Sequence, residues 1–389
     1  MRTATLVVTT INDPLVLESY GKNFDDYGHL EQVRVIVIPD RKTPPAAFST
    51  CGRLRDAGLK VLCPTLDDQD RFLNRLGLTP DFIPYNSDNR RNVGYLMALE
   101  DHSDFLISID DDNWCRGDSD YFGEHEYGLF GTVKSEVSSG PARFLNPIHP
   151  MGWYGTSCPV YARGFPYFAR FVDGESQVSA VSPNAPIDVA ISAGLWLRDP
   201  DVDAMTWLSA KPRLDSVVSQ IEVNAIDGGR VVLGDTMWAP VNSQNTAIAR
   251  KLIPSYYFLR MGYPIKGTRV GRMGDIFSGY FALACAKAVG CSACFGKPLV
   301  DHRRNSHDYL NDLSSELPAI MMLDNILPWL IDLKLDSSDV GSAYLSLSDS
   351  LDSQAERFSG SVWDDATRGF IHQMAYLMRV WLDAVRRIG

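Results

Sequence analysis

An excess of positive charge is absent from this sequence. Its 389 residues include 37 lysines and arginines against 48 aspartates and glutamates, which gives a formal net charge of -11. Proteins that bind nucleic acid in general need a basic face, so this balance argues against that class. It does not exclude a diphosphate ligand, because a bound metal ion reverses the local charge.

Long apolar runs are lacking as well. No segment reaches the ~18 apolar residues that a membrane span needs, and residues 1–10 lack the apolar run and cleavage site of a signal peptide. The seven cysteines are odd in number and scattered, which predicts a reduced protein in the cytoplasm. Cys291 and Cys294 form a lone C-x-x-C, so two buried cysteines are favoured over a zinc or redox site.

Apolar residues make up 45% of the chain, which is enough for a large core. The length allows two or three domains, although one elaborated α/β domain also fits. Runs rich in Val, Ile and Leu alternate with segments of helical character. Strands are expected at 3–10, 33–38 and 59–63, and helices near 44–57, 67–76 and 90–101. This alternation predicts a parallel sheet with helices on its faces.

A cluster of three carboxylates follows the next predicted strand. Residues 105–109 read Phe-Leu-Ile-Ser-Ile, and Asp110, Asp111 and Asp112 come directly after them. Open α/β folds place their ligands at the carboxyl ends of strands, and oxygen ligands suit Mg²⁺ or Mn²⁺. The arrangement resembles the Asp-x-Asp metal motif of the GT-A glycosyltransferases, in which the ion bridges the protein to a diphosphate. A surface turn after a core strand is the alternative.

The middle of the chain has little periodicity. Residues 113–186 are rich in Gly, Pro, Ser and aromatic side chains, and we expect a binding loop or lid there. Further strands are expected at 187–197 and 229–238, and a helix from about Asp275 to Val289.

The carboxyl-terminal part has helical patterns. Leu317 to Leu333 is apolar with helical spacing that Pro328 breaks, and residues 337–359 are expected to form a loop or a loosely held helix. Apolar residues three and four positions apart then define one helical face: Trp363, Ala366, Phe370, Met374, Leu377, Trp381, Ala384 and Ile388. We expect this face to pack on the main domain, with a subunit interface of a homo- or hetero-oligomer as the alternative. The expected division is a domain at 1–316 and a helical extension at 317–389.

Several segments between about residues 85 and 316 resemble, in the same order, the reversibly glycosylated polypeptides, the UDP-arabinopyranose mutase family. The matching segments are Ile107–Asp112, Arg163–Arg170, Ala193–Leu197 with Pro200–Ala204, Gly271–Gly279, and the pattern Pro298, His302, Asn311 and Glu316. Two positions depart from the family pattern, because Gly274 replaces an Asp and Ala193 replaces a His. The resemblance implies a GT-A-like, Rossmann-like α/β fold with a mostly parallel sheet and a metal-dependent UDP-sugar site.

The resemblance also implies which residues bind the metal and the nucleotide. Asp110, Asp112 and His302 would hold Mn²⁺ or Mg²⁺, and Asp111 would contact the ribose or the sugar. Thr9 and Thr10, at the end of the first strand, would hold the uracil and ribose, although a β-turn with the following residues explains them equally. Arg91 would steady the nucleotide or diphosphate, since a guanidinium matches phosphate oxygens, or it is an exposed helix start. Arg163 is structural or contacts phosphate.

The sugar end of the site would use three further residues. Arg170 matches the family's arginine that transiently carries the sugar, and it would need a carboxylate nearby because an arginine stays protonated. Asp275 sits at an expected helix start, where it is either an active-site acid or an ordinary N-cap. Asp201 and Asp203 either line the sugar pocket or form a turn with Pro200.

Two reactions fit this resemblance. The first is interconversion of UDP-arabinopyranose and UDP-arabinofuranose, and the second is transfer of a sugar from a UDP-sugar to a separate acceptor. A third possibility from another class is a non-catalytic subunit that binds nucleotide sugar within a complex.

Overall fold

A wide, mixed sheet organises the part of the chain that the computed structural model describes, namely residues 1–79, 81–131, 136–137, 143–148, 160–170, 178–179, 187–209, 221, 223 and 229–389. Its strands are β1 (Ala4–Thr10), β2 (Val33–Pro39), β3 (Lys60–Leu62), β4 (Phe105–Ile109), β5 (Asn113–Cys115), β6 (Glu136–Val137), β7 (Val178–Ser179), β8 (Val189–Arg198), β9 (Val231–Val232), β10 (Asn245–Ala249) and β13 (Ser292–His302). A separate hairpin joins β11 (Pro264–Ile265) to β12 (Thr268–Arg269).

The strand order is β3-β2-β1-β4-β10-β8-β13-β9-β6-β7, and β5 pairs with β13. Strands β3, β2, β1 and β4 are parallel, as are β8 and β13, whereas β10 runs antiparallel to both of its neighbours. Every residue of β4 is buried, as expected of a strand covered on both faces. The mostly parallel α/β sheet that the sequence predicted is confirmed.

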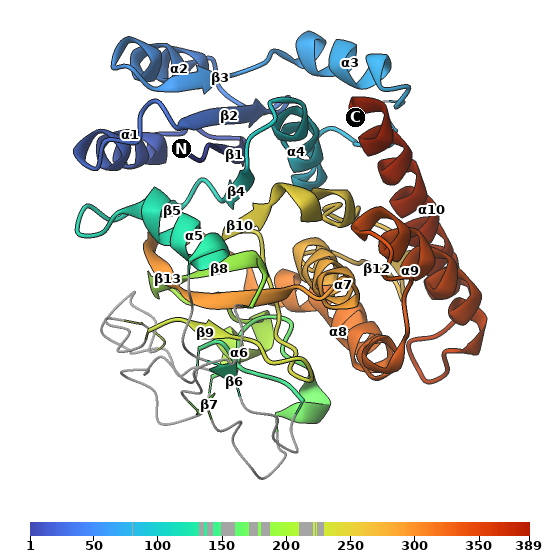
Figure 1. The fold of residues 1–389 in the computed structure, drawn as a ribbon. Coiled ribbons are helices and arrows are strands. Elements are labelled where there is room, and N and C mark those ends of the chain that lie inside the picture. Colours follow the sequence, from blue (N-terminus) through green and yellow to red (C-terminus); the bar gives the residue numbers. More distant parts are fainter. Residues whose placement is uncertain are drawn as a thin grey trace.

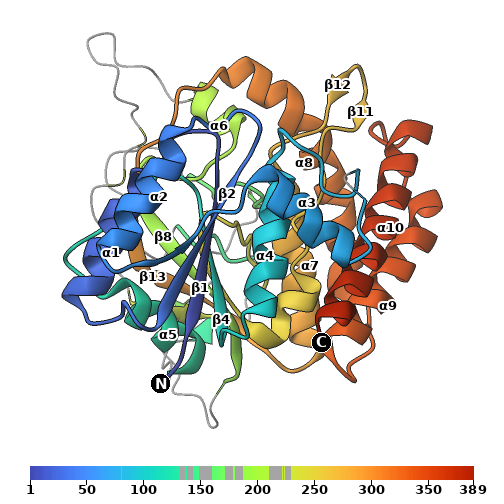
Figure 2. The same ribbon diagram turned by 90° about the horizontal axis from the view of Figure 1, so that it is seen from above.

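Helices cover both faces of the sheet. They are α1 (Val16–Asp26), α2 (Ala46–Asp56), α3 (Leu66–Arg75), α4 (Arg91–Glu100), α5 (Tyr121–Phe130), α6 (Ala204–Ser209), α7 (Gly274–Ala288), α8 (Tyr309–Asp332), α9 (Val340–Gln354) and α10 (Asp365–Ile388). Short 3-10 turns are η1 (Asp88–Arg90), η3 (Tyr167–Ala169), η4 (Arg250–Ser255) and η5 (Ala355–Arg357). In Figure 2, α1, α2 and α5 lie on one face, and α3, α4 and α7 lie on the other.

The carboxyl-terminal helices pack on the main sheet domain. Helix α9 contacts α7, and α10 covers α9, so the two form an outer layer (Figure 1). Trp381 is fully buried; its Nε1 donates a hydrogen bond to the Pro254 carbonyl at 3.1 Å, and its ring lies 5.6 Å from that of Tyr257. Trp363, Phe370, Met374, Leu377, Trp381 and Ala384 of the predicted apolar face are buried in this packing. The division after residue 316 stays a prediction, and residues 316 and 317 both lie inside α8.

Some predicted elements were wrong. Pro328 does not break its helix: α8 continues through it, since Pro328 lies on the exposed side while Ile326, Leu327 and Leu330 stay buried. For residues 337–359, expected to form a loop or a loosely held helix, the helical alternative is the correct one, because residues 340–354 form the regular helix α9. Residues 113–186 are not irregular throughout, because β5 and α5 occupy the beginning; much of the expected lid lies outside the described residues.

Two further findings concern the cysteine pair and membrane helices. Cys291 and Cys294 are both buried free thiols, as predicted. None of the helices in the described ranges is both long and apolar enough to cross a membrane.

Candidate functional site

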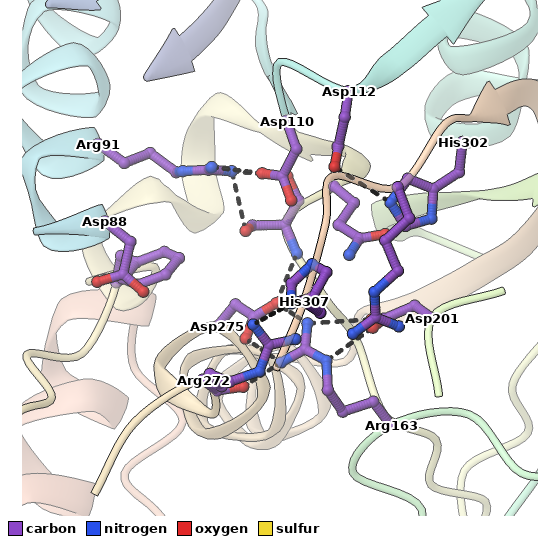
Figure 3. Close-up of a pocket in the computed structure, with 14 residues that line it drawn as sticks. Asp88, Arg91, Asp110, Asp112, Arg163, Asp201, Arg272, Asp275, His302 and His307 are labelled. Carbon is purple, nitrogen blue, oxygen red and sulfur yellow. Dashed lines mark hydrogen bonds and ion pairs between the residues drawn. The ribbon is translucent and has the colours of Figure 1, made fainter. Parts of the chain in front are cut away.

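The candidate site lies at the carboxyl ends of β1 and β4, where two adjoining cavities meet. The smaller one, the inner pocket, has a volume of about 170 Å³ (Figure 3). It is lined by Asp88, Arg91, Asp110, Asp112, Arg163, Asp201, Ser243, Gln244, Phe258, Arg272, Asp275, His302, Arg304 and His307. The outer pocket has a volume of about 450 Å³. It shares six of these residues and adds Thr9, Thr10, Ile11, Asn12, Ile38, Asp40, Lys42, Asn86, Ser87, Arg90, Asp111 and Asn305.

The three carboxylates of the acid triplet have separate partners. Asp110 Oδ1 accepts a hydrogen bond from Arg91, and burial raises the pKa of Asp110 although the Arg91 charge opposes this. Asp111 Oδ2 accepts hydrogen bonds from Thr10 Oγ1 at 2.6 Å and from Asn12 Nδ2 at 3.2 Å. Since Asp111 lines only the outer pocket and Asp110 lines both, the triplet spans the junction of the two cavities.

Asp112 faces His302 from the neighbouring strand end. Asp112 Oδ2 lies 3.4 Å from His302 Nε2, and His302 Nδ1 lies 2.6 Å from the Asp199 carbonyl oxygen. Burial lowers the pKa of His302, but the hydrogen bond and charge of Asp112 outweigh it and raise the pKa above its ordinary value. A histidine whose Nδ1–H is held by a carbonyl presents Nε2 as the typical metal-ligating atom. A proton or a cation at Nε2 would therefore satisfy Asp112.

The donor set around these residues suits a hard divalent ion. Asp110, Asp112 and His302 line the same pocket. The buried Gln244 Oε1 beside them has no hydrogen-bond partner among the described residues, and such an oxygen needs a donor or a cation. In the described ranges, no three His, Cys, Asp or Glu side chains are already gathered as a metal-binding cluster. The residues fit a metal ion whose shell a ligand completes.

Arg163 joins two acidic side chains that are far away in the sequence. Its guanidinium donates two hydrogen bonds to Asp201, at 2.7 and 3.0 Å, and two to Asp275, at 2.9 and 2.7 Å. Burial lowers the pKa of Arg163, but the two carboxylates outweigh it and raise the pKa well above its ordinary value. Asp275 is not the N-cap of α7: the helix begins at Gly274, after Met273, so Asp275 lies in the first turn.

Arg170 and Asp203 form a second pair, outside both pockets. Arg170 Nη2 donates to Asp203 Oδ2 at 2.6 Å, and its guanidinium lies 3.6 Å from the centre of the Tyr167 ring. Asp203 also accepts a hydrogen bond from the backbone N–H of Thr206 at the start of α6. Arg170 and Asp203 both lie in the described part of the chain, and neither of them lines the inner or the outer pocket.

The structure therefore gathers most of the predicted site residues. Thr9, Thr10, Arg91, Asp110, Asp111, Asp112, Arg163, Asp275 and His302 line one or both pockets, and Arg170 and Asp203 do not. Sequence reasoning missed the lining residues Asp40, Asp88, Gln244, Arg272, Arg304 and His307. Of these residues, only Arg272 could have been predicted from the sequence, because it lies in the segment Gly271–Gly279 that resembles the family.

Comparison with known proteins identifies the family. The family model described as "Reversibly glycosylated polypeptide" matches residues 65–385. UDP-arabinopyranose mutase 1 of Arabidopsis thaliana is 26% identical over 280 residues, which cover 71% of this chain and 69% of that protein. Probable UDP-arabinopyranose mutase 1 of Pisum sativum is 28% identical over 280 residues, which cover 71% of this chain and 68% of that protein.

Solved structures give a more remote likeness. Glucosyl-3-phosphoglycerate synthase from Mycobacterium tuberculosis, in complex with Mn²⁺ and UDP-glucose, matches with a TM-score of 0.38 and 12% identity. The match covers 82% of this chain and 78% of that one. The family match spans most of the chain, and this chain belongs to the reversibly glycosylated polypeptide family.

Proposed function

We propose that this protein is a UDP-sugar mutase that interconverts the pyranose and furanose forms of the sugar, with UDP-arabinose as the first substrate to test. The observation that carries the proposal is that the acid triplet, His302 and Arg163 border two adjoining pockets that share six lining residues. Relatives over about 70% of the chain are named UDP-arabinopyranose mutases. Family membership alone does not give the reaction, which is why the site chemistry matters.

The two pockets suit the two ends of a nucleotide sugar. In the outer pocket, Thr9 and Thr10 line the wall beside Asp111, whose carboxylate accepts hydroxyl hydrogen bonds of the kind a ribose offers. In the inner pocket, Asp201 and Asp275 face the cavity together with Arg163. We therefore place the nucleoside in the outer pocket and the sugar in the inner one.

A divalent cation, Mn²⁺ or Mg²⁺, would lie where the pockets join. Asp112 and His302 would hold it, with Asp110 beside them and the unpartnered Gln244 oxygen near. When bound, such an ion neutralises the charge that develops on a diphosphate leaving group. Arg91 keeps Asp110 in place, because its guanidinium also donates to Ser108 and Ser243.

The sugar is held on an arginine between departure and return of UDP. The bond from the anomeric carbon to the diphosphate oxygen breaks with its electron pair on UDP, a guanidinium nitrogen bonds to that carbon, and a neighbouring carboxylate accepts the nitrogen's proton. While the sugar is attached, the C1–O5 bond of the ring opens and the ring closes again through O4, and UDP then displaces the nitrogen, which takes its proton back. The family resemblance assigns this role to Arg170, with Asp203 as the carboxylate at 2.6 Å. Arg163 lines the sugar end, whereas Arg170 does not, but Arg163 would have to give up a hydrogen bond to Asp201 or Asp275 before one of its nitrogens could bond to the sugar.

Peptide mapping after incubation with UDP-arabinopyranose and Mn²⁺ tests this step. We expect the protein to gain the mass of one pentosyl group, on Arg163 if pocket geometry decides and on Arg170 if the resemblance does. Arg163→Lys and Arg170→Lys, measured in parallel, assign the position independently. Interconversion of the nucleotide sugar without any protein adduct would contradict the covalent step.

Transfer to a separate acceptor is the second candidate function. It is favoured by a local change in this chain, because the family's Asp at position 274 is replaced by Gly274. A Cβ atom at Gly274 would lie 2.5 Å from the Leu259 carbonyl oxygen, so the backbone here leaves no room for that side chain. Release of UDP that depends on an added sugar acceptor would support transfer. Location in the cytoplasm and assembly into oligomers stay predictions.

A further inference from the structure

We propose that Arg272 binds the diphosphate of the nucleotide sugar, an inference that rests on the proposed UDP-sugar function. Arg272 lines both the inner and the outer pocket, so it borders the junction between the sugar end and the nucleoside end. In Figure 3 its side chain lies beside that of His307. A diphosphate that connects a nucleoside in the outer pocket to a sugar in the inner pocket must pass this junction.

The backbone and side chain of Arg272 are held in an unusual position. Its φ angle is +58°, in the left-handed region that residues other than glycine rarely adopt. The Arg272 carbonyl accepts a hydrogen bond from Arg163, and its Nε donates to Glu316 Oε1 at 2.8 Å. Glu316 is fully buried, and its other oxygen accepts the Ala204 N–H at 2.8 Å. Strained residues that persist in this way cluster at ligand sites.

Two other arginines that line the inner pocket, Arg91 and Arg163, already use their terminal nitrogens in hydrogen bonds. Arg91 is 5% exposed, and its two terminal nitrogens donate to Ser108, Ser243, Thr9 and Asp110. Arg163 is 7% exposed, and all three of its nitrogens donate to Asp201, Asp275 or the Arg272 carbonyl. A phosphate would have to break these ion pairs to reach either guanidinium.

Arg272 keeps donors that a phosphate can reach. Its side chain is 30% exposed, and among the described residues its Nη2 makes no hydrogen bond. Its Nη1 has one contact, 3.5 Å from His307 Nδ1, but that nitrogen lies closer, at 2.9 Å, to Asp312 Oδ2. An arginine fixed at Nε and free at its outer edge is suited to bidentate binding of phosphate oxygens.

The charge around the junction also calls for this cation. Four carboxylates line the inner pocket besides the metal candidate Asp112, namely those of Asp88, Asp110, Asp201 and Asp275. His307 does not offset them, because burial and then the charges of Arg304 and Arg272 lower its pKa. The Asp312 carboxylate opposes that shift without reversing it. A diphosphate that enters this site meets these carboxylates, and the outer nitrogens of Arg272 would offset their charge in addition to a metal ion, while the Nε of Arg272 stays paired with Glu316 and Asp312.

Calorimetric titration with uridine and with UDP, both with Mn²⁺ present, tests the inference in Arg272→Gln. The glutamine amide keeps a donor for Glu316 but removes the charge. We expect the affinity for UDP to fall by about 10- to 100-fold, since hydrogen bonds to charged groups have that effect, and the affinity for uridine to stay unchanged. The matched control is Arg269→Gln, on β12 three residues away, where the guanidinium donates to the Gly262 carbonyl and lines neither pocket.

The uridine titration serves as the check on folding. Equal losses for uridine and UDP in Arg272→Gln would show a structural effect and overturn the inference, as would unchanged UDP affinity. If the unmodified protein binds uridine but gains nothing from the diphosphate of UDP, the inference also fails. If it binds neither probe, the proposed UDP-sugar function fails with it, so the two failures are distinguishable.

Discussion

Asp112→Asn is expected to weaken Mn²⁺-dependent binding of UDP by at least about 100-fold. Mutation of a residue that only hydrogen-bonds to a metal ligand lowers metal affinity by about 10- to 100-fold, and Asp112 is proposed to bind the ion directly. The amide is neutral and is a poorer ligand than the carboxylate. It also leaves His302 Nε2, now 3.4 Å from Asp112 Oδ2, without its charged partner. Calorimetric titration of UDP with Mn²⁺ and with a chelator measures the effect.

A matched substitution separates this effect from the loss of any acid in the same segment. Asp118 lies six residues further along the chain, is 61% exposed, pairs with Arg116 and lines neither pocket. Asp118→Asn should therefore bind UDP as the unmodified protein does. Equal UDP affinity in Asp112→Asn and the unmodified protein, with Mn²⁺ required in both, would remove Asp112 from the proposed metal site.

Arg163→Met is expected to lower the free energy of unfolding by about 3–5 kcal/mol, because removing one partner leaves buried charge uncompensated. Asp201 and Asp275 are 6% and 7% exposed, and each receives two hydrogen bonds from Arg163. Methionine has similar length but no donors, so both carboxylates would have to take up protons or open to water. Urea unfolding followed by tryptophan fluorescence gives the difference.

The control for this prediction is an exposed arginine. Arg386 pairs with Asp383 at 3.4 Å within α10, and the two side chains are 55% and 64% exposed. Exposed pairs contribute at most about 1 kcal/mol, so Arg386→Met should change stability by less than that. A loss in Arg163→Met no larger than in Arg386→Met would show that the buried network adds no stability.

The sequence predicted the part of the fold whose signals are local. β1, β2 and β4 are continuous apolar runs, and Asp110 follows β4 directly, so the location of the acid triplet was predictable from neighbouring residues alone. Strand β13 was not predicted, because Gly296 and Pro298 interrupt its apolar pattern. The strand lies between β8 and β9 and ends at His302. His302 was found only through the family resemblance.

Contacts between side chains that are far apart in the chain could not be predicted from the sequence. Arg163 meets Asp201 and Asp275, which lie 38 and 112 residues away, and no local pattern records such a meeting. Arg170 was expected at the sugar, but it pairs with Asp203 outside both pockets. The six residues between Arg163 and Arg170 decide which of the two arginines reaches the cavity, and their path depends on tertiary packing.

The most direct test of the central claim is to incubate the unmodified protein with UDP-arabinopyranose and Mn²⁺ and to separate the nucleotide sugars by chromatography. We expect that UDP-arabinofuranose appears, that the same mixture is reached from UDP-arabinofuranose, and that Asp112→Asn gives neither conversion. UDP-arabinopyranose that is bound but recovered unchanged in the presence of Mn²⁺ would contradict the mutase function.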